Sequence, residues 1–196
     1  MVAAARYNGG MANILLFHSA YGLRPAVYVA ADRLRAAGHT VTTPDLCDGR
    51  TAERIDEAIA LRDEIGAATL RSRVAEAIAD IPAGTIVSGF SLGARHAFAV
   101  AAGDRRIAGL LLFHSTGEAP VVHEGLPVQL HVAADDEWEP AEEVATWQAG
   151  LARAGAQVEV FEYRGGHLFT DPDLPDHNAA SAALAWERAL KFCASL

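Results

Sequence analysis

The stretch that decides the fold is "GTIVSGFSLGARHAFAVAA", residues 84–102. Its first part, 84–89, is a short apolar run of the kind that forms buried strands, and over 92–102 apolar residues recur at helical spacing. The turn between them holds Ser91, with a glycine two positions away on either side. The stretch therefore predicts a β-strand that turns sharply into a helix, a unit from which α/β folds are built.

The same alternation of apolar runs and helical patterns extends along the whole chain. Five further buried strands are expected, at residues 13–18, 39–44, 107–114, 128–133 and 158–163. Helices are expected at residues 26–37, 51–65, 68–81, 92–102, 141–154 and 179–194. Strands that are apolar on both faces indicate a mostly parallel sheet, here of about six strands, with helices on both faces.

The length of the chain, 196 residues, is enough for one sizeable core, so we expect a single domain over residues 13–196. Residues 1–12 are expected to be a disordered extension, because Met11 is as plausible a natural start as Met1. Only the connections after Leu46 and after His114 are long, so the sequence leaves little room for a cap domain.

Composition excludes several classes of function. The net charge of −9, without any lysine or arginine run, disfavours nucleic acid as a partner. No apolar run approaches the roughly 20 residues of a membrane span, and no export signal is recognisable. Cys47 and Cys193 lie too far apart for a metal motif or a disulfide framework, which favours the cytoplasm. Nothing in the sequence indicates an oligomeric state.

The strand, tight turn and helix around Ser91 are typical of a nucleophile elbow. Gly89 and Gly93 would leave room for a strained turn that exposes the Ser91 hydroxyl above the sheet. The helix that begins near Leu92 would direct its free backbone N–H groups at a developing oxyanion. An ordinary serine in a glycine-rich loop is the alternative interpretation.

A serine nucleophile requires a base and an acid to orient that base, in this fold in the order serine, acid, histidine. The strand of "PVQLHVAADDEWEP" ends in Asp135 and Asp136, and the next strand ends in a glycine pair followed by His167. His167 is therefore the expected base. A strand tip can present either aspartate, so both remain candidates from this reasoning alone.

The other histidines fit this order less well. His18 and His114 each end a strand in the same "LLFHS" sequence, which places them either near the site or in the core. Among the rest, His177 lies in a polar loop and is expected to be solvated, and His131 lies inside a strand. Three precede the acid in sequence: His39, His96 and His123.

These motifs resemble the dienelactone hydrolase family of the α/β-hydrolase superfamily. The resemblance runs from Ile14 to near the end of the chain, through "FHSAYGLRPAV", "GFSLG", "PVQLHVAADDEW" and "YRGGHLFTDPDLPDH". It implies a small, lidless α/β-hydrolase fold, a triad of Ser91, Asp136 and His167, and a second oxyanion donor at the backbone N–H of Ala20. Asp136 is favoured over Asp135 because it completes the family's acid-strand pattern.

The chain departs from the family's namesake enzymes at two positions. Those enzymes carry a cysteine in the elbow and an activating glutamate in the first turn, where this chain has Ser91 and Ser19. A thiolate and a serine hydroxyl need different activation, so we expect a serine esterase on the same scaffold. An open, shallow pocket is expected, and core packing of the aromatic residues is the alternative. The expected pocket residues are His18, Ser19, Tyr21, Phe90, His114, Trp138 and Phe169.

The sequence thus predicts hydrolysis of a small ester, lactone or thioester through an acyl-enzyme, without a metal or organic cofactor. The alternative is a hydrolase-fold protein that binds a small molecule with little or no turnover. Arg24, Arg95 and Arg164 would either bind a substrate carboxylate or lie at the surface. A nucleotide-binding fold is disfavoured, because "HSAYG" after the first strand is no phosphate-binding loop.

Overall fold

The fold is a six-stranded parallel sheet in the order β2-β1-β3-β4-β5-β6. A computed structural model describes residues 10–117 and 122–196, and the strands and helices given below are those of this part of the chain. The strands are β1 (Asn13–Phe17), β2 (Thr40–Thr42), β3 (Thr85–Phe90), β4 (Ile107–Phe113), β5 (Pro127–Ala133) and β6 (Gln157–Tyr163). Every neighbouring pair is parallel, which confirms the expected α/β-hydrolase-type architecture.

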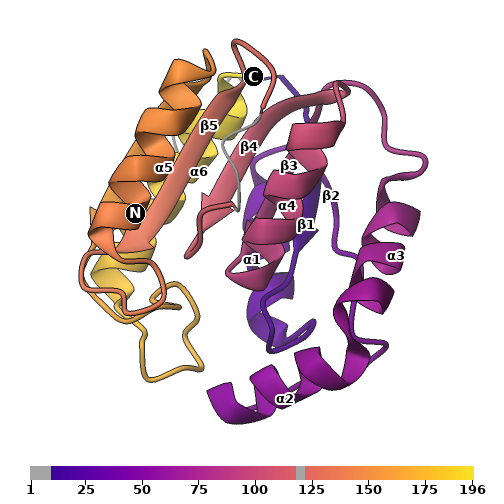
Figure 1. Cartoon of the computed structure of the whole chain (residues 1–196), viewed down its shortest axis with the longest axis vertical. Helices are drawn as coiled ribbons and strands as arrows, with labels where there is room; N and C mark the ends of the chain where they lie inside the picture. The colour runs from indigo at the N-terminus through magenta and orange to yellow at the C-terminus, as the bar shows by residue number, and fades with distance from the viewer. Residues whose placement is uncertain (1–9, 118–121) are drawn as a thin grey trace.

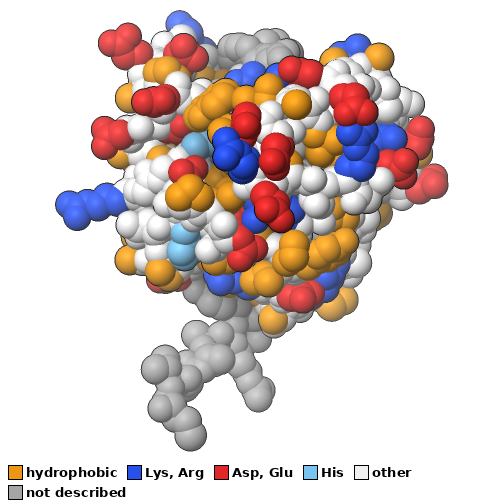
Figure 2. Space-filling model, turned by 90° about the horizontal axis from the view of Figure 1, so that it is seen from below, with side chains coloured by type: hydrophobic (Ala, Val, Ile, Leu, Met, Phe, Trp, Pro, Cys, Tyr) orange, Lys and Arg blue, Asp and Glu red, His pale blue; other side chains and the backbone are white. Residues whose placement is uncertain are grey.

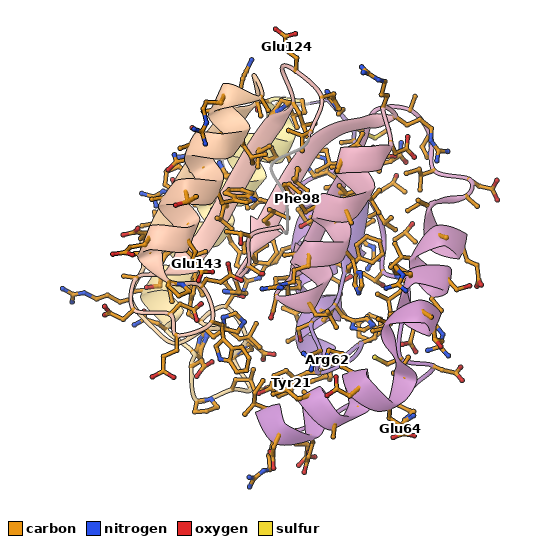
Figure 3. The ribbon with its side chains drawn as sticks, in the orientation of Figure 1. Tyr21, Arg62, Glu64, Phe98, Glu124 and Glu143 are labelled. Carbon is orange, nitrogen blue, oxygen red and sulfur yellow. The ribbon has the colours of Figure 1, made fainter. Side chains whose placement is uncertain are left out.

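Helices cover both faces of this sheet, as Figure 1 shows. They are α1 (Pro25–Ala36), α2 (Ile55–Ile65), α3 (Ala67–Ile78), α4 (Leu92–Gly103), α5 (Ala141–Arg153) and α6 (Ala179–Ala194). One apolar cluster joins the sheet to α3, α4 and α5, and a second joins the opposite face to α1 and α6. Phe98 of α4 lies between α4 and α5 (Figure 3), where its ring centroid is 6.0 Å from that of Trp147.

Sheet position explains how strongly each strand is buried. The central strand β3 is buried at all six positions because helices cover both of its faces. The edge strand β6 is only partly buried, and its Glu159 and Glu162 are exposed. The second edge strand, β2, has three residues, of which only Val41 is buried. The expectation of strands apolar on both faces therefore holds for the inner strands and fails at the edges.

The element boundaries are close to those expected, with one clear difference. Helix α2 begins at Ile55 rather than at residue 51, and residues 51–54 form an irregular approach in which Ala52 N–H donates to Tyr21 O at 3.0 Å. The helix lies across the edge of the sheet at which the strands end (Figure 1). Its Ala58 belongs to a small buried cluster with Tyr21 and Leu168. Helix α2 thereby packs beside the carboxyl edge of the sheet.

The carboxyl edge also contains the switch point of the sheet. The chain passes from β1 outward to β2, and then returns to β3 on the other side of β1. Loops after adjacent strands diverge at such a point, which leaves the crevice where ligands bind in open α/β sheets. The turn after β1 and the turn after β3 therefore face each other across the expected site.

The expected N-terminal extension falls largely on residues 1–9, which lie outside the described residues. Of its last residues, Ala12 is joined to the sheet, since its carbonyl accepts from Thr40 N–H at 3.0 Å. Within the described ranges no helix is both long and apolar enough to cross a membrane.

Candidate active site

Ser91 occupies a strained turn between β3 and α4. Its backbone angles, φ +51° and ψ −112°, lie in a region that residues with a side chain rarely adopt. A Cβ at Gly89 would lie 2.3 Å from the backbone of Gly93, and a Cβ at Gly93 would lie 2.4 Å from His18 O. The two glycines therefore let strand, helix and the end of β1 approach one another directly beneath Ser91.

His167 lies between Ser91 and Asp136. Its Nε2 is 2.8 Å from Ser91 Oγ, and its Nδ1 is 2.7 Å from Asp136 Oδ2. The Asp136 side chain is fully buried, and its other oxygen accepts the backbone N–H of Trp138 at 2.9 Å. Asp135, by contrast, is exposed. The structure thus brings three of the sequence-derived candidates into one hydrogen-bonded chain and leaves the alternative aspartate outside it.

The loop that presents His167 is held by Asp176. Gly166 N–H donates to the Asp176 carbonyl at 3.0 Å, and Leu168 N–H donates to its carboxylate at 3.1 Å. A Cβ at Gly166 would lie 2.5 Å from the same carboxylate, so glycine is required for this close approach. Gly165 adopts φ +124°, which a side chain would strain. The expected glycine turn is therefore rigidly anchored on both sides of His167.

The turn after β1 lies opposite the elbow. Ser19 Oγ accepts Tyr21 N–H at 3.3 Å, and Ser19 O accepts Gly22 N–H at 3.1 Å, which fixes the turn. Ala20 lies at the centre of this turn, across the switch point from Leu92. Leu92 is the first residue of α4, where a backbone N–H has no partner within its own helix.

His18 and His114 lie beneath the site, and each is fully buried. Leu46 N–H donates to His18 Nε2 at 2.9 Å, so Nδ1 carries the hydrogen and donates to Ser19 O at 2.7 Å. Burial lowers the pKa of His18 and lowers that of His114 well below its ordinary value. Both imidazoles are therefore neutral parts of the scaffold, and neither lines the cavity next to the site.

The cavity beside the site includes only part of the expected pocket. It is a groove of about 190 Å³ between α1 and α6, and of the expected pocket residues Ser19 and Phe90 line it. Phe169 is fully buried in the core, and Tyr21 is buried in the cluster beside α2 (Figure 3). Trp138 is half exposed, with its ring centroid 6.0 Å from that of His167. Trp138 thus flanks the site outside the groove.

The three arginines have different environments. The Arg24 guanidinium lies 3.5 Å from Asp171 and 3.7 Å from Asp173 and is largely buried, whereas Arg164 is exposed. Arg95 is half exposed and lies 3.5 Å from the Glu139 carboxylate. In Figure 2, which looks onto the carboxyl edge, positive and negative side chains are interspersed with apolar ones.

Glu139 is a residue that the sequence reasoning missed. The "EPAEEVATWQ" segment indicates carboxylates at the start of a helix, and Glu142 and Glu143 are indeed exposed in the first turn of α5. Glu139 precedes that helix and is buried. It accepts hydrogen bonds from the Ser115 hydroxyl at 2.5 Å and from the Thr116 N–H at 3.0 Å. Its place directly before Pro140, outside the helix, was the only available signal.

His131 and His177 form hydrogen bonds with groups other than Ser91. His131 is fully buried between strands, with its Nδ1 2.8 Å from the Tyr163 hydroxyl. His177 is half buried rather than solvated, because its Nδ1 donates to Phe169 O at 2.9 Å. Within residues 10–117 and 122–196, no group of three or more histidine, cysteine or acidic side chains is arranged to hold a metal ion.

The parallel sheet, the strained turn and the switch-point crevice define a hydrolase of the α/β-hydrolase superfamily. The chain belongs to the dienelactone hydrolase family, whose model matches residues 3–196. No curated protein matches the sequence.

Solved structures show the same fold at low sequence identity. A putative dienelactone hydrolase from Klebsiella pneumoniae is 19% identical with a TM-score of 0.75, covering 96% of this chain and 89% of that one. The dienelactone hydrolase-like promiscuous phosphotriesterase P91, from metagenomic libraries, is 20% identical with a TM-score of 0.79, covering 96% and 88%. Esterase 2 of Thermogutta terrifontis, solved phosphorylated by paraoxon, is 16% identical with a TM-score of 0.60, covering 96% and 84%.

Proposed function

We propose that this protein is a serine esterase that hydrolyses a small ester, lactone or thioester through an acyl-enzyme, with Ser91, His167 and Asp136 as its catalytic triad. One observation carries the proposal: the continuous hydrogen-bonded chain from Ser91 Oγ through His167 to Asp136, with distances of 2.8 and 2.7 Å. Membership of a hydrolase family supports it independently.

In the proposed first half-reaction, Ser91 Oγ attacks the substrate carbonyl carbon while His167 Nε2 takes the hydroxyl proton. Asp136 accepts the hydrogen bond from His167 Nδ1–H, which fixes the tautomer that leaves Nε2 free to accept. The resulting imidazolium lies against a buried carboxylate, so its charge is compensated. When the carbon–oxygen bond to the alcohol breaks, His167 returns the proton to the leaving oxygen.

The second half-reaction repeats these steps with water. His167 removes a proton from a water molecule, the hydroxide attacks the acyl carbon, and the bond to Ser91 Oγ breaks as the serine regains its proton. Backbone N–H groups of Leu92 and Ala20 are the proposed oxyanion donors in both half-reactions, because Leu92 begins helix α4 and Ala20 lies within the fixed turn after β1. No step requires a cofactor.

A fluorophosphonate probe tests the proposal directly, since it forms a covalent bond only with an activated serine. We expect a label at Ser91 in the wild type, identified by mass spectrometry, and none in His167→Ala. Ester hydrolysis should fall at least about 10⁴-fold in Ser91→Ala. Ser88→Ala is a matched control, because Ser88 is buried three residues earlier and its hydroxyl has no hydrogen-bond partner within the described residues.

Asp136→Asn and Asp135→Asn form a second matched pair. We expect the former to lower kcat about 10⁴-fold by favouring the wrong histidine tautomer, and the latter to change it less than about twofold. If a small ligand binds and Ser91 is never labelled, the protein is instead a hydrolase-fold binding protein.

The cytoplasm is the proposed location, and a small molecule is the proposed partner. Cys47 and Cys193 are both free and buried, and burial raises their pKa values to about 11 and about 12. Such thiols persist in a reducing compartment.

A further inference from the structure

The groove between α1 and α6 has a definite length and direction. Both helices lie on the same face of the sheet, behind it in Figure 1, and both begin at the carboxyl edge. The groove is lined from Ala26 to Arg33 on α1 and from Ala179 to Trp186 on α6. Seven residues of helix rise about 10 Å. The groove therefore runs about 10 Å from the carboxyl edge along the face of the sheet.

One end of the groove lies at the candidate active site. Ser19, which precedes the proposed oxyanion donor Ala20, lines it, and so do Phe90 and Leu168. These last two residues adjoin Ser91 and His167 in the chain. At the other end, the Arg33 guanidinium lies 5.6 Å from the centroid of the Trp186 ring. A molecule in the groove would thus extend from the chain neighbours of Ser91 and His167 to Arg33.

Between its two ends the groove is lined by small or apolar side chains. Ala30 of α1 and Ala182 of α6 line it, together with Phe90 and Trp186. These residues supply no hydrogen-bonding side chain except the Trp186 indole. This part of the groove therefore favours an apolar group.

The polar residues at the site end are already occupied. Thr170 Oγ1 lies 2.7 Å from His114 Nε2, and His177 donates to a backbone carbonyl. Asp171 lies 3.5 Å from the Arg24 guanidinium. A polar ligand would have to compete with these partners, whereas an apolar chain would not.

We propose that this groove binds a single unbranched apolar chain of the ester substrate, up to about eight carbons long. An extended chain advances about 1.2 Å per bond, so about eight carbons span its length. The volume agrees, because an apolar cavity of about 150 Å³ holds benzene and this one has about 190 Å³. The proposal rests on the proposed function for its substrate, and the tests below separate the two.

The first experiment measures kcat/KM for two series of esters. One series varies the acyl chain from acetyl to dodecanoyl with a fixed p-nitrophenol leaving group, and the other varies the alcohol chain of acetate esters. We expect kcat/KM to rise about two- to fourfold per methylene in one series up to about eight carbons and then to level off. The series that responds identifies which side of the ester occupies the groove.

Ala183→Trp tests the location of the chain. Ala183 is exposed and lines the groove, so the larger ring blocks it without entering the core. We expect the gain in kcat/KM from longer chains to vanish in this variant. Ala180→Trp is the matched control, because Ala180 is equally exposed on α6 and does not line the groove. The control should keep the chain-length dependence of the wild type.

Direct binding keeps the proposal testable if no ester is turned over. Calorimetry with octanoate and butanoate should show octanoate bound at least about tenfold tighter by the wild type and by Ala180→Trp, and no such preference in Ala183→Trp. This result without hydrolysis would sustain the groove and refute the esterase. A chain-length dependence that is absent from the wild type, or unchanged in Ala183→Trp, would overturn the groove and leave the esterase intact.

Discussion

Gly93 is the residue on which the geometry beneath Ser91 depends most. An added Cβ would meet backbone atoms on β1, 2.4 Å from His18 O and 2.5 Å from Phe17 O, rather than a flexible side chain. Backbone within a buried strand cannot move aside without disturbing the ladders on both sides. The second glycine of the "GFSLG" motif therefore allows the start of α4 to pack against the end of β1, and it also allows the tight turn at Ser91.

Gly93→Ala should therefore lower the free energy of unfolding by about 1–3 kcal/mol and displace Ser91 from His167. Urea unfolding measures the first effect, and fluorophosphonate labelling the second. Gly103→Ala is the control, because Gly103 ends the same helix with nothing within 4 Å of an added Cβ. That variant should be neutral or more stable by up to about 1 kcal/mol. Equal stabilities of the two variants would contradict the packing argument.

At the scale of elements, the buried carboxylate of Glu139 joins three parts of the site. It accepts hydrogen bonds from Ser115 and Thr116, which follow β4, and it lies 3.5 Å from Arg95 on α4. It belongs to the same turn as Asp136, whose carbonyl accepts Glu139 N–H at 3.3 Å. Glu139 thus links the loop of the proposed acid, Asp136, to β4 and α4, and we propose it as a positioning residue for this acid loop.

Glu139→Ala should lower the free energy of unfolding by about 1–3 kcal/mol, because it leaves the buried donor of Ser115 and the partly buried donors of Thr116 without this acceptor. With the acid loop loosened, kcat should fall about tenfold while the pH profile of kcat/KM also shifts. Glu142→Ala, an exposed neighbour, should match the wild type in both measurements. A variant that lost stability but kept kcat and its pH profile would limit Glu139 to a structural role.

At the scale of the whole molecule, buried neutral histidines couple stability to pH. Burial lowers the pKa values of His18, His39 and His114, and it lowers that of His131 to about 3. The unfolded chain binds protons on these side chains below about pH 6.5, whereas the folded chain does not. Their contribution to the free energy of unfolding is therefore fully present above that pH and is lost progressively as the pH falls.

When the pH is lowered from 7.5 to 5, protonation of His131 in the unfolded chain should by itself lower the free energy of unfolding by about 2 kcal/mol. The other three histidines should lower it further. Urea titrations at several pH values measure the slope. His131→Phe keeps a ring against Phe113 and should flatten this slope even if it lowers stability at pH 7.5. If the pH dependence of the unfolding free energy were unchanged in His131→Phe, His131 would have to bind its proton equally well in the folded and the unfolded protein.

The fold was predictable because its determinants are local. Apolar runs and helical spacing along the chain indicate the strands and helices, and burial on both faces of the inner strands indicates a parallel sheet. The position of Ser91 was equally predictable, since a strand, a glycine-flanked turn and a helix adjoin in sequence. The edge character of β6 was not, because the order of strands depends on contacts between distant segments.

Neighbouring residues alone indicate the alternation of elements, the elbow at Ser91 and the place of His167 after the last strand. Contacts between distant segments bury Phe169 and Glu139, and they bring Asp136, which only the family resemblance favoured over Asp135, next to His167. The same kind of contact creates the groove, whose walls come from helices at opposite ends of the chain. The physical reason is that burial and side-chain distance depend on which elements pack together, and no local pattern encodes that.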